Sequence, residues 1–126
     1  IEALNAQGKS LKGSRVLVLG IAYKKDIDDD RESPSLKLIE ILQGKGAAVL
    51  YNDPYIPRLK KSRRYEFSLS SVKLTERLLK NVDVVLIATD HSRYDYGWIA
   101  RHAQLVIDTR NAVKDKQKFA GKVIGA

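Results

Sequence analysis

The sequence contains no cysteine and no methionine. Without cysteine the chain has no disulfide framework, no thiolate metal site and no cysteine nucleophile, which excludes those routes to stability and catalysis. No apolar run approaches the length of a membrane span, and the opening residues show no signal-peptide pattern. We therefore expect a cytoplasmic domain without a membrane partner. Because translation starts with methionine and this chain begins at Ile1, we also expect it to be a piece of a longer protein.

Acidic residues are fewer than basic ones, with 15 aspartates and glutamates against 23 lysines and arginines. The net charge is +8, and the densest basic run spans residues 58–64. Such a run can neutralise nucleic-acid phosphates, attract a small diphosphate ligand or keep a domain soluble. No glycine–arginine repeat, ribonucleoprotein aromatic motif or zinc-finger spacing accompanies it. We therefore favour a solvated face and expect no nucleic-acid partner.

Apolar runs alternate with helical patterns and turns over the whole chain. Its 126 residues, 44% of them hydrophobic, suit one domain with a single core. The expected strands are residues 15–19, 47–51, 82–88 and 105–108, with an edge strand at 122–124, and the expected helices are 34–43, 74–81 and 96–101. This alternation predicts an α/β fold, a Rossmann-like doubly wound parallel sheet in three α/β/α layers.

Local signals mark the helix ends. Ser33 is a good N-cap, and Pro34 suits the first helical position. We expect the next helix to be capped by Ser70 or Ser71, and residues 57–71 to form a variable surface connection. The first helix should bury one apolar face, formed by Leu36, Leu38, Ile39, Ile41 and Leu42. It should stop at the glycines that follow, Gly44 and Gly46.

Right-handed crossovers bring the loops after the strands to one edge of the sheet, where doubly wound folds bind ligands. The converging loops are residues 20–32, 52–54, 89–92 and 108–111. The first begins like a dinucleotide loop at Gly20 but lacks the second and third glycines that allow a pyrophosphate to approach. We therefore disfavour NAD(P) at this turn.

Several cationic and aromatic side chains lie on the first loop. Lys24 and Lys25 could meet a phosphate or face solvent, balanced by neighbouring aspartates. Tyr23 could stack on a base or pack on the sheet edge. Arg31 has a fork suited to phosphate, although the preceding residues 28–30 are aspartates and favour a structural ion pair.

The later loops offer fewer candidates. Arg110 follows a strand end, two residues after Asp108, and we expect it to contact the ligand. Asp53 could bind ribose hydroxyls, but an Asp-Pro turn is the simpler interpretation. His91 and His102 lack metal-ligand spacing and a partner nucleophile, so we assign no catalytic, metal or cofactor-binding residue.

Residues 20–26 read G-x-A-Y-K-K-D, and residues 29–34 read D-x-R-E-S-P. These motifs resemble the C-terminal domain of the UDP-glucose/GDP-mannose dehydrogenase family. The resemblance continues, in order, through residues 11–16, 46–47, 52–54, 82–85, 88–91 and 106–110. Such enzymes use NAD to oxidise the C6 alcohol of a nucleotide sugar to a carboxylate.

The resemblance implies a C-terminal nucleotide-sugar-binding domain at residues 13–126. Residues 1–12 would be the end of an upstream central helix and a linker. NAD, the catalytic cysteine and its assisting lysine would belong to a missing N-terminal part. The central helices imply a homodimer or larger homo-oligomer.

Matched position by position, Tyr23 and Lys24 correspond to an aromatic–lysine pair associated with the nucleotide. Arg110 corresponds to an arginine that contacts the substrate. We also expect Arg31, which is not matched in this way, to belong to the UDP-sugar site. Residues 88–92 and 94–96 are closer to the branch acting on UDP-N-acetylhexosamines than to the UDP-glucose branch. Two other functions stay open, a stand-alone module sensing NAD or another adenine nucleotide and a basic nucleic-acid-binding domain.

Overall fold

The computed structural model describes residues 10–22, 26, 33–59 and 69–125. Five parallel strands form one sheet in the spatial order β2-β1-β3-β4-β5. The strands are β1 (Arg15–Leu19), β2 (Ala48–Asn52), β3 (Val84–Ile87), β4 (Val106–Asp108) and β5 (Val123–Gly125). The helices are α2 (Pro34–Gly44), α3 (Glu76–Asn81), α4 (Tyr96–His102) and the short 3₁₀ helix η1 (Lys116–Phe119). The predicted α/β class, including the fifth strand at the edge, is confirmed.

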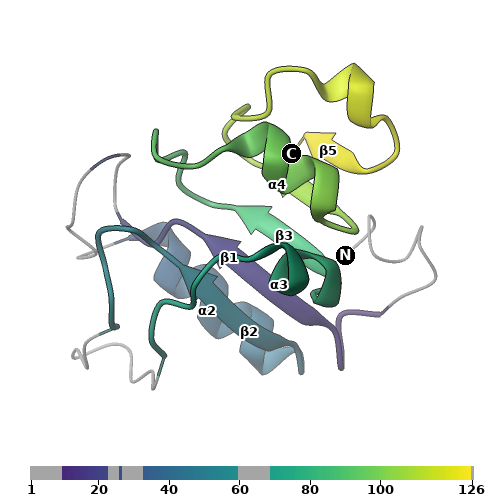
Figure 1. Ribbon diagram of the computed structural model, residues 1–126. Coiled ribbons are helices and arrows are strands. Elements are labelled where there is room, and N and C mark those ends of the chain that lie inside the picture. The colour runs from purple at the N-terminus through teal and green to yellow at the C-terminus, as the bar shows by residue number, and fades with distance from the viewer. Residues whose placement is uncertain (1–9, 23–25, 27–32, 60–68, 126) are drawn as a thin grey trace.

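Helices cover both faces of the sheet (Figure 1). Helix α2 lies behind it in that view, and α3 and α4 lie in front. Successive residues of β1 point to opposite faces. Val16 and Val18 pack on the α2 side with Ile39, whereas Leu17 and Leu19 pack on the other side, as do α3 and α4. Because both faces of β1 are covered beyond its exposed first residue, its sequence from Val16 to Leu19 is an unbroken apolar run.

Helix α2 starts where its cap residues predict. Ser33 is the N-cap, its Oγ accepts the N–H of Ser35 at 3.2 Å, and Pro34 occupies the first turn. Ile39 and Leu42 are buried, but Ile41 is 43% exposed. The prediction that Ile41 shares the buried face was wrong, because a helix turns about 200° between Ile39 and Ile41.

The cap predicted for the second helix was also wrong. Helix α3 begins at Glu76, and Thr75 is its N-cap, with Oγ1 accepting the N–H of Leu78 at 3.0 Å. The hydroxyl of Ser71 instead accepts the N–H of Asp53 at 2.9 Å. The hydroxyl of Ser71, four residues before Thr75, is already bonded to the end of β2, so Thr75, directly before the helix, is the cap.

The connection at 57–71 is partly built into the core. Leu59 is buried, and its N–H donates to the carbonyl of Leu69 at 3.1 Å. Arg58 and Ser70 form an antiparallel bridge beside that bond. Residues 60–68, with most of the basic run, lie outside the described part. None of the helices that the structure describes is long and apolar enough to span a membrane.

Candidate functional site

The loops after the strands meet at the carboxyl edge of the sheet. Of the four expected ligand-binding residues, Arg110 is described, whereas Tyr23, Lys24 and Arg31 lie outside the described residues. The assignment of those three therefore stays a prediction.

Asp53, at the end of β2, closes the turn after β1. Its side chain is buried, and Oδ2 accepts the N–H groups of Ile21 at 2.7 Å and Ala22 at 3.1 Å. Oδ1 accepts the N–H of Tyr55 at 2.8 Å, which is the local turn expected from the sequence. In dinucleotide-binding folds, backbone N–H groups at this first turn hold the pyrophosphate. Here a carboxylate of the chain itself occupies two of them, so these two amides are not available to a pyrophosphate.

His91, in the loop after β3, is fully buried against Asp53. Its Nε2 lies 2.8 Å from Oδ2 of Asp53, and its Nδ1 accepts the N–H of Asp26 at 2.7 Å. A ring nitrogen that accepts a hydrogen bond carries no proton, so His91 is the neutral tautomer with its proton on Nε2. The sequence suggested no role for this histidine.

Asp26 ties the first loop to the third. Its carboxylate accepts the N–H and the hydroxyl of Ser92, both at 2.7 Å. The backbone of Asp26 has φ of +62°, a left-handed conformation that aspartate tolerates better than most residues. The loops after β1, β2 and β3 are thus joined through polar side chains.

Asp108 organises the turn after β4. Its buried carboxylate accepts the N–H groups of Arg110, Ala112 and Val113, and the Nζ of Lys116 lies 3.1 Å away. Burial acts to raise the pKa of Asp108, but these backbone and lysine hydrogen bonds outweigh it, and the pKa lies below its usual value. The turn is therefore held by a stable anion.

Arg110 lies exposed at this edge, and its Nε donates to the carbonyl of Ala88 at 3.0 Å. Among the described residues, the two terminal guanidinium nitrogens have no hydrogen-bond partner. This bond positions the side chain, and a planar guanidinium fork suits an anion.

Two hollows border Arg110. One, of about 270 Å³, lies between it and the start of α2: Pro34, Ser35, Leu38, Ala88, Thr109 and Arg110. The other, of about 520 Å³, lies toward β5 and includes Asn111 and Lys116. Ser33 already engages the N–H of Ser35, so the guanidinium is the strongest anion contact that the first hollow offers.

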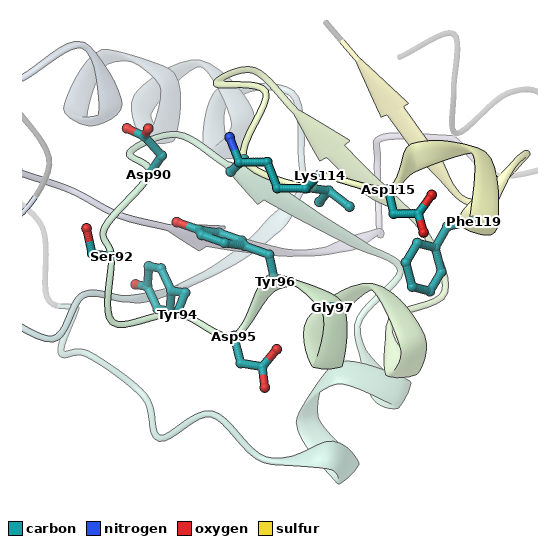
Figure 2. A pocket seen from close by; sticks show the side chains of 11 residues that line it. Asp90, Ser92, Tyr94, Asp95, Tyr96, Gly97, Lys114, Asp115 and Phe119 are labelled. Atoms are coloured by element: carbon teal, nitrogen blue, oxygen red, sulfur yellow. The ribbon is translucent and has the colours of Figure 1, made fainter.

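A third hollow, of about 460 Å³, lies on the α4 side (Figure 2). Figure 2 shows the hydroxyl of Tyr96 directed toward the loop after β3, where it donates to the carbonyl of His91 at 2.8 Å. Burial and nearby carboxylates raise the pKa of Tyr96, which keeps that proton in place. The charged residues that line this third hollow are mostly acidic, which disfavours a diphosphate. They are Asp90, Asp95 and Asp115, with Lys114 as the one base among the described lining residues.

No group of histidine or carboxylate side chains suited to a metal ion occurs among the described residues. Sequence reasoning missed Asp53 and His91 as organisers of this edge, because their partners are far apart along the chain.

Comparisons with known proteins agree on one family. The model of the UDP-glucose/GDP-mannose dehydrogenase family, UDP binding domain, matches residues 17–115. A UDP-N-acetyl-D-mannosamine dehydrogenase from Pyrococcus horikoshii is 33% identical over 120 residues, covering 90% of this chain and 26% of that protein. A UDP-glucose 6-dehydrogenase from Rickettsia prowazekii is 31% identical over 112 residues, covering 84% and 26%.

Solved structures agree as well. The UDP-D-ManNAc dehydrogenase of Pyrococcus horikoshii superposes with a TM-score of 0.75 at 28% identity, covering 98% of this chain and 28% of that one. The class of protein is thus an α/β domain built like part of a nucleotide-sugar dehydrogenase. The chain belongs to the UDP-glucose/GDP-mannose dehydrogenase family and corresponds to its UDP binding domain. It spans about a quarter of the length of the curated relatives it matches.

Proposed function

We propose that the chain binds the UDP part of a nucleotide sugar at the carboxyl edge of its sheet, with Arg110 holding the diphosphate. The observation that carries this proposal is the guanidinium fork of Arg110 beside the start of α2, whose two terminal nitrogens have no hydrogen-bond partner among the described residues. Tyr23, Lys24 and Arg31 are proposed to complete the site. Charge-assisted contacts from a planar arginine suit a diphosphate particularly well.

We propose further that the whole protein is an NAD-dependent enzyme that oxidises the C6 alcohol of a UDP-N-acetylhexosamine to a carboxylate. Several relatives are named as UDP-N-acetyl-D-mannosamine dehydrogenases, which supports this substrate. Relatives named as UDP-glucose 6-dehydrogenases reach similar identity, so UDP-glucose is the competing substrate to be tested.

NAD would be bound outside this chain, because Asp53 already occupies the amides of the turn after β1. Catalysis would lie outside it too, since the chain offers no cysteine nucleophile. We also propose that the whole protein is cytoplasmic and forms a homodimer or larger homo-oligomer through the missing region. The boundary between the linker and this domain is proposed at residues 12 and 13.

Parallel titrations of UDP, uridine, NAD and duplex DNA at two salt concentrations test the function. We expect UDP to bind and uridine to bind more weakly, because uridine lacks the diphosphate that Arg110 would hold. NAD binding stronger than UDP binding would support the adenine-nucleotide module. Strongly salt-dependent DNA binding would support the nucleic-acid domain. Nuclear magnetic resonance suits the titration because it detects weak binding.

A further inference from the structure

The fully buried imidazole of His91 joins two segments of backbone that lie either side of residues 23–25. On one side, Asp53 holds the N–H groups of Ile21 and Ala22. On the other, His91 holds the N–H of Asp26 through Nδ1. The bond between Nε2 and Oδ2 of Asp53, at 2.8 Å, connects the two sides.

The imidazole has little freedom to turn. The ring of Tyr55 meets it edge-on, with centroids 4.8 Å apart, and the ring of Tyr94 lies 6.0 Å away. The hydroxyl of Tyr94 donates to the carbonyl of Asn52, and burial raises its pKa, so this support stays protonated. Tyr96 holds the carbonyl of His91.

We infer that His91 and Asp53 are a positioning pair for nucleotide binding, which fixes where the loop after β1 leaves the sheet and where it returns at Asp26. The inference rests on the proposed function, since Tyr23 and Lys24 lie between these points in the sequence. Any buried imidazole needs partners for its ring nitrogens, so the evidence for positioning is which partners these are: the backbone N–H of Asp26 and the carboxylate that holds the N–H groups at the start of the loop. Here both ring nitrogens are engaged, in one defined tautomer.

Two conservative variants separate the bonds of His91. The amide oxygen of asparagine reaches about as far as Nδ1, so His91→Asn keeps an acceptor for the N–H of Asp26. The amide nitrogen of glutamine reaches about as far as Nε2, so His91→Gln keeps the donor to Asp53 and loses that acceptor. We expect His91→Gln, which leaves the N–H of Asp26 without its acceptor, to weaken UDP binding about 10-fold, the equivalent of one net hydrogen bond. His91→Asn loses the donor to Asp53, but Oδ2 of Asp53 keeps the N–H groups of Ile21 and Ala22, so we expect it to weaken binding less than about 3-fold.

A matched control is His102→Gln in α4. Gln104, two residues later, bonds to the carbonyl of Val82 near the start of β3, so His102 lies near the opposite edge of the sheet. This control should leave UDP affinity unchanged. Melting temperatures are measured for all variants. A purely packing role would lower stability and affinity together, to the same extent in the asparagine and glutamine variants, which would overturn the inference.

A readout without ligand completes the test. The ring ¹⁵N shifts of His91 should show a protonated Nε2 and an unprotonated Nδ1, and the Asp26 amide should exchange slowly in the wild type and fast in His91→Gln. The opposite tautomer or a fast-exchanging wild-type amide would overturn the pair. UDP binding with equal affinity in every variant would overturn the pair and leave the proposed function standing. If the wild type bound no UDP, the proposed function itself would fail, and the positioning role with it.

Discussion

Gly20 and Thr89 touch so closely that no side chain fits between them. A Cβ atom on Gly20 would lie 2.5 Å from the Cβ of Thr89 and 2.6 Å from its backbone oxygen. Gly20 also has φ of +90°, which a residue with a side chain rarely adopts. The glycine that follows β1 is therefore required by the contact with the loop after β3.

Replacing Gly20 by alanine should be strongly destabilising. Left-handed backbone and an overpacked contact with rigid backbone together cost about 2–4 kcal/mol. Gly44→Ala is the control, because Gly44 lies at the end of α2 with no atom within 4 Å of an added Cβ. Denaturant unfolding should show a large loss for the first variant and a small gain for the second. Equal effects would mean that the contact with Thr89 relaxes easily.

Ser33→Ala should lower the free energy of unfolding by about 1 kcal/mol, because the N–H of Ser35 loses its cap. That corresponds to a few degrees in melting temperature for a domain of this size. Because the cap directly follows the ligand loop in sequence, we expect weaker UDP binding as well. Intact UDP affinity with a lowered melting temperature would show that the cap is only structural.

Arg110→Ala should weaken UDP binding by about 1.5–3 kcal/mol, since it removes a charge-assisted contact. Stability should fall by no more than about 1 kcal/mol, the worth of the bond to Ala88. Arg101→Ala, an exposed arginine on α4, is the control and should change neither quantity. Lys24→Ala should also weaken UDP binding. If both Arg110→Ala and Lys24→Ala left the affinity for UDP unchanged, the proposed UDP site would be wrong.

Asp108→Asn should destabilise the domain at neutral pH by about 1–3 kcal/mol, because hydrogen bonds to a charged acceptor are the stronger ones. The pKa of Asp108 is depressed in the folded chain, so its contribution is complete above the ordinary value of 3.8 and is lost as pH falls through the folded value. The stability gap between the two proteins should therefore narrow in acid. Asp115→Asn makes the same charge change at an exposed position and should show neither effect.

The purified chain should reduce no NAD when given UDP-sugars. It has no cysteine nucleophile, and Asp53 takes the amides that would hold a pyrophosphate. The absorbance of NADH reports the result directly. Measurable turnover would contradict the division of labour between this chain and the rest of the protein.

Much of the fold could be predicted because its signals are local. The strand at residues 15–19 is an apolar run that stops at Gly20, and α2 starts at Ser33 and Pro34 through cap chemistry within a single turn. The cap of α3 was harder, since several hydroxyl residues precede that helix. Only the tertiary structure shows which hydroxyl caps α3, because Ser71 is bonded to Asp53 and Thr75 takes the cap position.

The sequence by itself determined the alternation of strands and helices, and with it the edge where the loops converge. The roles of Asp53 and His91 were decided only by the tertiary structure. His91 is separated by 38 residues from Asp53 and by 65 from Asp26, and no periodicity links such positions. A buried polar group must have a hydrogen-bond partner. Which residue becomes that partner depends on the order of the strands in the sheet, because that order decides which loops lie next to each other.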